Sequence, residues 1–274
     1  MSTPDLLSTR PAGLPQPRRY PGVNWVGVIT LYQREVRRFW KVGAQTVAAP
    51  VVTTLLYMLV FVVALQGARP LHGTPFAEFV APGLIMMAIL NNAFANSSSS
   101  LIQAKIMGTA TDFLTPPLSP LELTLGFTLG SATRGVLVGL VTAICVLPFA
   151  RLGMANILAI IWFAVAASFI MGMLGVLAGL WSEKFDHLSA VQNFVVMPMT
   201  FLSGAFYLVE NLPEPFATVS HFNPFFYLID GFRYGFIGHA ESNLAVGVVG
   251  SAVLMVVMAA ACWLVFRSGW RLKS

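Results

Sequence analysis

Six stretches of this sequence are apolar, nearly free of charge and long enough to cross a lipid bilayer. They cover residues 46–66, 78–102, 122–150, 156–181, 188–209 and 243–266. A helix needs about 20 apolar residues to span the hydrocarbon core. Only 10% of the residues are charged, against about 25% in an ordinary soluble domain. The sequence therefore predicts an all-α integral membrane protein with six transmembrane helices.

Basic residues are divided unevenly between the loops that would join these spans. With both termini in the cytoplasm, twelve Lys and Arg residues lie inside and three lie outside, namely Arg69, Arg151 and Arg233. Cytoplasmic loops carry an excess of such residues, so we expect an N-in, C-in topology. Arg134 lies near the inner boundary of the third span. We interpret it as a snorkelling arginine, and a buried functional charge is the alternative.

The first part of the chain divides into a tail and an amphipathic helix. Residues 1–22 contain five prolines, three arginines and no apolar run, which predicts a disordered cytoplasmic tail rather than a signal peptide. Residues 25–41 place aromatic and aliphatic side chains at helical spacing, with Arg34, Arg37, Arg38 and Lys41 on another side. We expect an interfacial helix, either a passive anchor or a connecting helix that touches a cytoplasmic partner.

A polar, proline-rich segment, "GTATDFLTPPLSP" (108–120), interrupts the apolar sequence between the second and third spans. Thr111 and Asp112 can cap a short helix, and the prolines at 116, 117 and 120 end it rigidly. The result is a stiff cytoplasmic elbow that presents Asp112, Phe113 and Leu114. A plain connector remains the alternative on local composition alone.

Polar and aromatic residues mark three further regions. Asn91, Asn92 and Asn96 lie within the second span, where unpaired amides are costly, so they must face protein or a watery cavity. Met197, Met199, Phe201, Phe206 and Tyr207 give the fifth span an adaptable apolar surface, which lipid-facing or core packing also explains. Residues 210–241 are rich in Pro, Gly and aromatics and predict re-entrant outer helices, in which Asp230 and Arg233 can pair as a link or gate.

Other classes of protein find little support. The basic residues cluster at the termini, which fits membrane topology better than nucleic-acid binding. Cys145 and Cys262 lie in apolar runs, and the four histidines show no metal-ligand spacing. No paired carboxylates or nucleophile–base pair indicate an enzyme. No G-x-x-x-x-G-K-[ST] sequence is present, so the chain cannot bind ATP in the Walker manner.

Several stretches, in the right order, resemble the membrane subunit of type 2 ABC exporters, closest to the bacterial inner-membrane transport permeases. The family's first and second spans are resembled by the stretches "QTVAAPVVTTLLYMLVF" (45–61) and "FVAPGLIMMAILNNAFANSSSS" (79–100). The family's coupling segment is resembled by "FLTPPLSPLEL" (113–123). The family's fifth span and outer loop are resembled by "LSGAFYLVENLP" (202–213) followed by "NPFFYLIDGFRYGFIG" (223–238). The resemblance covers residues 25–274 and implies one transmembrane domain over 23–274.

The resemblance implies a homodimer of permeases in the bacterial inner membrane, working with two copies of a separate ATPase that binds ATP and Mg²⁺. The permease itself would be non-catalytic and hold no cofactor or metal. ATPase coupling is expected at the elbow and the interfacial helix: Asp112, Phe113, Leu114, Thr115, Pro116, Pro117, Arg37 and Arg38. A translocation path or dimer interface is expected at Asn91, Asn92, Asn96, Met197, Phe201, Phe206 and Tyr207, and an outer gate at Asp230 and Arg233.

The cargo implied by the resemblance is amphipathic: lipid-like, glycan or drug-like. Two alternatives stay open. A stand-alone channel or secondary transporter would usually place ionisable residues within its spans, which here carry only Arg134 and boundary residues such as Glu122. A non-transporting scaffold subunit is the alternative that the sequence excludes least well.

Replacing both Asp112 and Phe113 with Ala is expected to uncouple ATPase binding or stimulation, because the elbow would lose the side chains that it presents. Membrane insertion should stay intact, since neither residue belongs to a span. ATPase activity and transport in the double variant check this, and normal transport would show that the elbow is assigned wrongly.

Overall fold

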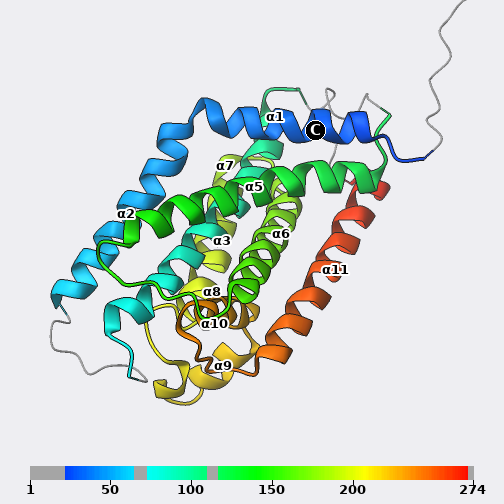
Figure 1. Ribbon diagram of the computed structural model, residues 1–274. Helices are drawn as coiled ribbons and strands as arrows, with labels where there is room; N and C mark the ends of the chain where they lie inside the picture. The colour runs from blue at the N-terminus through cyan, green and yellow to red at the C-terminus, as the bar shows by residue number, and fades with distance from the viewer. Residues whose placement is uncertain (1–21, 65–72, 110–116, 271–274) are drawn as a thin grey trace, which may run out of the picture.

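The computed structural model describes residues 22–64, 73–109 and 117–270, and within these ranges every regular element is helical. Five helices are long and apolar enough to cross a membrane. They are α2 (Gly43–Ala64), α3 (Phe76–Ile106), α5 (Pro120–Val146), α6 (Ile157–Trp181) and α11 (Leu244–Ser268). Figure 1 shows α3 and α6 in the middle of the bundle, with α2 and α11 on its sides. The all-helical prediction is confirmed for the described residues.

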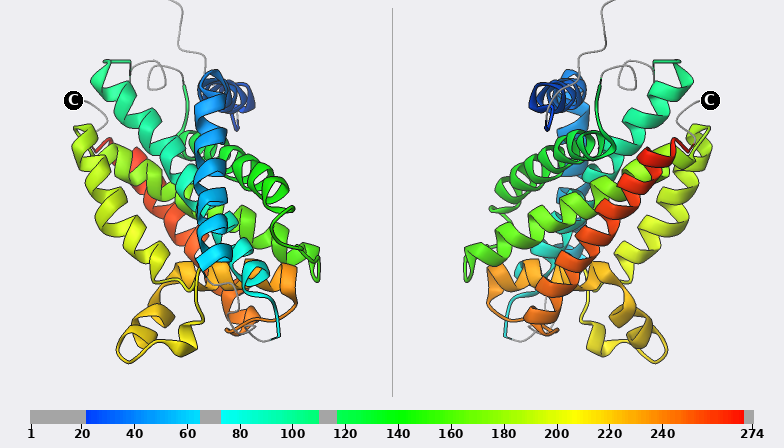
Figure 2. Two further views of the ribbon diagram at one scale, coloured as in Figure 1. Left: turned by 90° about the vertical axis from the view of Figure 1, so that its left-hand side faces the viewer. Right: turned by 90° about the vertical axis from the view of Figure 1, so that its right-hand side faces the viewer.

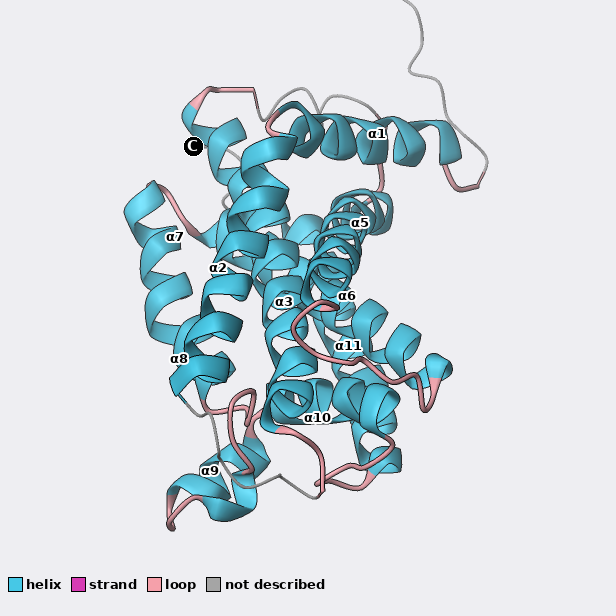
Figure 3. Cartoon of the chain, turned by 60° about the vertical axis from the view of Figure 1, so that its left-hand side comes forward, coloured by secondary structure: helices cyan, strands magenta, loops and turns pink. Residues whose placement is uncertain are grey.

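A further membrane-length segment is built from three short pieces. The helices α7 (Phe185–Val191), η1 (Gln192–Val196) and α8 (Met197–Phe201) follow one another without a break, and η1 has π-helical hydrogen bonding. Figure 3 shows α7 and α8 as one column beside α2. The prediction that this span reaches residue 209 was wrong, because the chain turns at Gly204, whose φ of 70° favours glycine.

The two ends of the bundle are closed by helices that lie across it. At one end, here called the α1 end, α1 (Trp25–Lys41) crosses the bundle, and the last turn of α11 returns to the same end (Figure 1). At the other, the α10 end, lie η2 (Val209–Asn211), α9 (Phe216–Phe222) and α10 (Pro224–Ile237). Figure 2 shows from two sides that α10 stays at this end of the molecule and does not run to the α1 end.

Short polar residues fix where several helices begin and end. Ser119 and Glu122 form a capping box at the start of α5, with Pro120 as the first helical residue. The Asn24 side chain accepts from the backbone N–H of Gly27 and starts α1 at Trp25. Gly238, with a φ of 79°, ends α10 in the left-handed conformation. These signals are local, so the sequence alone specifies these boundaries.

Glycines allow the central helices to approach closely. A Cβ atom on Gly175 of α6 would lie 2.4 Å from the backbone oxygen of Phe94 in α3, and one on Gly179 would lie 2.9 Å from that of Ser98. The glycines of α5 have other partners. Gly126 and Gly130 pack on α1, and Gly139 packs on Ile89 of α3. The glycines thus allow close contacts among α3, α6, α5 and α1.

Replacing Gly175 with Ala should lower thermal stability, because the added methyl group would strike backbone rather than a movable side chain. Overpacking of this kind costs about 1–3 kcal/mol. Gly250→Ala is the matched control, since nothing lies within 4 Å of its Cβ position on α11. Unfolding temperatures of both variants in one detergent check the prediction, and equal values would contradict the close α3–α6 contact.

Candidate functional site

The buried helix α3 carries many polar side chains for a segment that crosses a membrane. Asn92 and Asn96 are 6% and 0% exposed, and Ser97, Ser98 and Ser100 are also buried. Buried amides and hydroxyls need hydrogen-bond partners, because hydrocarbon offers none. The partners come from four other segments, so α3 is the helix on which the polar groups of the protein meet.

At the α1 end, Glu35 and Arg38 of α1 reach into α3. Glu35 is fully buried and accepts a hydrogen bond of 2.7 Å from Ser100 Oγ. The Arg38 guanidinium lies 3.3 Å from the Glu35 carboxylate and donates to both the backbone and side-chain oxygens of Asn96, at 2.6 and 3.1 Å. A third hydrogen bond runs from Arg38 Nη1 to Ser99 Oγ at 3.1 Å. These residues, Glu35, Arg38, Asn96, Ser99 and Ser100, are called the α1–α3 polar cluster.

The cluster changes the interpretation of the interfacial helix. Its buried face consists of Val28, Leu31, Glu35 and Phe39, whereas Trp25, Ile29 and Trp40 are exposed. The expected division into an aromatic face and a basic face was therefore incomplete. Arg37 is exposed, as ATPase contact would require, but Arg38 points into the bundle and is already bonded. The coupling role of both residues stays a prediction.

Arg134 lies midway along α5 and binds α3, not the membrane surface. Its Nη2 donates to Asn92 Oδ1 at 3.1 Å, and its Nε is buried without a hydrogen-bond partner among the described residues. Arg134 is half-buried, and its hydrogen bond to Asn92 favours the alternative of a charge held within the protein over snorkelling. Both interpretations stay predictions.

Asn91 faces the opposite neighbour, the π-helical segment η1. Gln192 Nε2 donates to Asn91 Oδ1 at 2.7 Å. Beside this bond, towards the α1 end, α3 and α7–η1 enclose a groove of about 250 Å³. Its polar lining consists of Ser98, Ser99, Ser189, Gln192 and Asn193, here called the serine groove. A π-helical turn often marks a functional position, and here it lies where the groove ends.

Towards the α10 end, aromatic rings continue along the same side of the molecule. Phe206 lies 5.1 Å from Phe61 and 5.7 Å from Phe201, measured between ring centroids, and 6.2 Å from Tyr57. Tyr207 donates from its hydroxyl to the Phe201 carbonyl at 2.9 Å. Met197 and Phe201 are both more than two-fifths exposed. The expected path residues of the fifth span therefore line one side with α2, next to the serine groove.

Asp230 and Arg233 are buried at the α10 end but do not form the expected direct pair. Arg233 Nη1 lies 3.0 Å from Glu241, and its Nη2 donates to the Gly204 carbonyl at 2.5 Å. Asp230 instead accepts from the backbone N–H groups of Glu241 and Ser242, at 3.0 and 2.8 Å. Burial raises the pKa of Glu241 to about 7, although Arg233 opposes the shift. This network joins α10 to the turns after α8 and before α11.

The elbow is described only at its edges. Asp112, Phe113, Leu114, Thr115 and Pro116 lie outside the described residues, and Pro117 is exposed. The segment that leads from the elbow into α5 is bonded to the start of α1. Asn24 Nδ2 donates to the Pro117 carbonyl at 3.4 Å, and the Asn24 backbone N–H donates to the Glu122 carboxylate in the first turn of α5 at 2.5 Å. A Cβ atom on Gly27 would lie 2.5 Å from Leu118. The start of α1 and the end of the elbow therefore form one unit.

Several residues of the site were not expected, among them Glu35, Gln192 and Glu241. Glu35 had a detectable signal, because it lies four residues from both Leu31 and Phe39, on the face that α1 buries. Gln192 and Glu241 had none, since their partners lie 101 and 8 residues away in the chain and only the fold selects them. Within the described ranges, no group of three His, Cys, Asp or Glu residues has the arrangement to hold a metal.

Comparison with known proteins identifies relatives along nearly the whole chain. The sequence profile of the family described as ABC-2 type transporter matches residues 27–237. The inner membrane transport permease YadH of Escherichia coli (strain K12) is 32% identical over 252 residues, which cover 91% of this chain and 98% of YadH. Nodulation protein J of Rhizobium leguminosarum bv. viciae is 24% identical over 257 residues, which cover 92% and 93% of the two chains.

Replacing Glu35 with Ala should destabilise the protein, because it leaves Arg38 without its carboxylate and Ser100 without its acceptor. Removing one partner of a buried ion pair costs about 3–5 kcal/mol. The 25% exposure of the Arg38 side chain reduces our expectation to about 2–3 kcal/mol. Glu35→Gln, which keeps an acceptor for Ser100, should lose less.

Arg37→Ala is the matched control, because Arg37 is an exposed cation on the same helix. Thermal unfolding of the three variants in one detergent checks the prediction. The α1–α3 polar cluster would carry no stability if Glu35→Ala and Arg37→Ala unfolded at the same temperature.

Proposed function

The chain belongs to the ABC-2 type transporter family, and from this membership we propose that it is the membrane subunit of an exporter driven by a separate ATPase. It is a multi-pass transport permease of the inner membrane. The sequence lacks a Walker phosphate-binding loop, so ATP and Mg²⁺ are bound by another polypeptide. Two copies of that ATPase work with two copies of the permease.

The observation that carries this proposal is the continuous connection from the elbow, through α1, to the polar residues of α3 at the α1 end. The end of the elbow is bonded to the start of α1 through Asn24. Further along α1, Glu35 and Arg38 bond it to α3. A displacement of the elbow by an ATPase is therefore passed to α1 and to the polar part of α3. A protein that only anchors itself in the membrane has no need of such a connection.

The orientation of the chain follows from charge. Arg34, Arg37 and Lys41 of α1, Lys105 near the end of α3 and Arg267 near the end of α11 gather at the α1 end. We place this end in the cytoplasm, since cytoplasmic loops are enriched in basic residues. The segment 185–201 then completes the set of six spans, as the fifth in chain order, and α9 and α10 lie in the outer leaflet as re-entrant helices.

The second copy packs along α2 and α7–α8. Ser189 and Asn193 are exposed on this side, although both lie in a membrane-spanning segment. Polar groups at such positions face protein or water rather than lipid. Phe194, which is 81% exposed, and the exposed face of α2 supply the apolar surface for the contact. The same side carries the serine groove and the aromatic residues Tyr57, Phe201 and Phe206.

The substrate path runs between the two copies along this side. Its cytoplasmic part is the polar serine groove, and its outer part is lined by the aromatic rings. A path that is polar at one end and apolar at the other suits an amphipathic cargo, such as a lipid-like, glycan or drug-like molecule. The Asn91–Gln192 hydrogen bond, which joins α3 to η1 within each copy, lies where the two parts of the path meet. The buried network of Asp230, Arg233 and Glu241 closes the outer end.

A mild-detergent purification of the chain from its native membrane tests the proposal. We expect an ATP-binding subunit to co-purify at about equal stoichiometry, because the permease and ATPase copies are equal in number. Mass spectrometry of the complex identifies the subunit and its copy number. A folded, dimeric chain that reproducibly carries no ATPase would overturn the exporter proposal and favour a channel or scaffold.

A further inference from the structure

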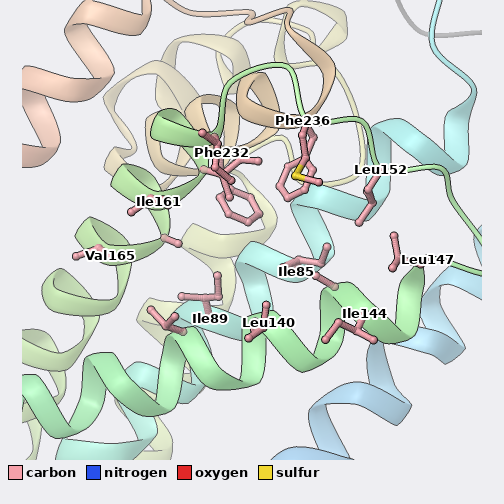
Figure 4. Close-up of a pocket in the computed structure, with 17 residues that line it drawn as sticks. Ile85, Ile89, Leu140, Ile144, Leu147, Leu152, Ile161, Val165, Phe232 and Phe236 are labelled. Carbon is pink, nitrogen blue, oxygen red and sulfur yellow. The ribbon is translucent and has the colours of Figure 1, made fainter.

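A second cavity lies away from the proposed path, on the side of the molecule formed by α5 and α6. It has a volume of about 400 Å³, within the range of small-molecule sites, about 300–1,000 Å³. Figure 4 shows its lining side chains converging from α3, α5, α6, α10 and the loop between α5 and α6. Its floor is buried, at Ile85, Ile89 and Phe232, whereas its rim is exposed, at Leu140, Ile144 and Ile161. It is therefore a pocket that opens sideways from the bundle.

The walls of this pocket are held in place by close backbone contacts. A Cβ atom on Gly139 would lie 2.4 Å from Ile89, so α5 rests directly on α3 at the floor. The Asn156 backbone N–H donates to the Gly235 carbonyl at 2.9 Å, which ties the start of α6 to α10. A Cβ atom on Gly153 would lie 2.9 Å from the Phe236 carbonyl, so the loop also rests on α10. The pocket is thus part of the fold.

The chemistry of the lining decides what fills the pocket. All of its lining side chains are apolar or belong to glycine. Water needs two to four polar partners to occupy a cavity, and this one offers almost none. An empty space would deprive its walls of dispersion contacts, and the pocket opens toward the hydrocarbon of the bilayer. A flexible hydrocarbon chain satisfies both conditions.

One cation lies at the end of the pocket. Between Arg134 and Glu183, Arg151 is the single charged residue of the sequence. Arg151 is exposed and directly precedes Leu152, which lines the pocket next to Leu147 at the end of α5. Since Arg151 follows the last turn of a membrane span, its guanidinium lies at the level of the lipid headgroups. Arginine binds phosphate through paired N–H groups.

We propose that this pocket binds one acyl chain of an anionic glycerophospholipid, with the lipid phosphate at Arg151. The lipid fills the cleft between α5, α6 and α10 and steadies α10, which carries Asp230 and Arg233. This site is separate from the serine groove and requires neither ATP nor a partner. Its failure would therefore leave the exporter proposal untouched, and failure of the exporter proposal would leave this site untouched.

The test uses the full chain in phosphatidylcholine nanodiscs that contain a small fraction of phosphatidylglycerol with a photoreactive acyl chain. After illumination, mass spectrometry maps the labelled peptides. We expect more labelling on residues 136–165, which contain most of the pocket lining, than on the exposed surface of α11. Ala143→Phe, which fills the pocket, should reduce this labelling several-fold, and Ala260→Phe, the same change at an exposed position of α11, should not. Leu140→Trp, at the exposed rim, gives a second blocking variant if Ala143→Phe does not fold.

The headgroup is tested with the same label on phosphatidylcholine. The unchanged chain should prefer phosphatidylglycerol, and Arg151→Gln should abolish the preference, whereas Lys184→Gln at the α1 end should keep it. Labelling of the pocket that does not exceed that of α11, or that survives both blocking variants, would overturn the site. Equal labelling by both lipids would overturn the role of Arg151. A pocket that neither lipid labels, in a chain that retains a different lipid-linked molecule, would make it a substrate site instead.

Discussion

The polar side chains buried on α3 impose the constraint on which the rest of the structure depends. An amide or a charge in hydrocarbon must find its partner within the protein. Asn91, Asn92 and Asn96 are spaced so that they point to three neighbours, and each neighbour supplies one matching group: Gln192 from η1, Arg134 from α5 and Arg38 from α1. The helices around α3 are therefore positioned by hydrogen bonds as well as by packing. Glycines on α5 and α6 permit the short distances that these bonds require.

These bonds also explain how a membrane bundle can carry a mechanical signal. Helices in lipid gain no hydrophobic driving force from each other, because lipid tails are as apolar as the side chains, so packing and interhelical hydrogen bonds hold them together. A buried ion pair such as Arg38–Glu35, anchored on Asn96 and Ser100, has few alternative partners and fixes α1 to α3 in one register. At the α10 end, the network of Arg233, Glu241 and Asp230 fixes α10 in the same way. The two networks leave the serine groove and the aromatic side between them as the part that is free to change.

Much of the fold could be predicted from the sequence, because its signals are local. Long apolar runs indicate the membrane helices, and Asn24, Ser119 and Gly238 indicate helix boundaries. The site was predicted less well, because it depends on contacts between distant residues. The position of Asn92 was apparent in the sequence, but its partner Arg134 was interpreted as an interfacial residue, and Arg233 was paired with Asp230 rather than Glu241. Glu35 was the one detectable signal, because a charged residue on the apolar face of α1 predicts a buried polar contact with the bundle.

We infer that α1 and α3 move together when the ATPases bind ATP. Spin labels at Gln33 of α1 and Gln103 of α3, two exposed positions, measure this directly by pulsed electron resonance in the assembled transporter, after Cys145 and Cys262 are replaced. We expect the distance between Gln33 labels on the two copies to shorten with ATP, while the distance between Gln33 and Gln103 within one copy stays constant. A change within one copy, with α3 remaining in place, would show that the α1–α3 polar cluster does not transmit the movement.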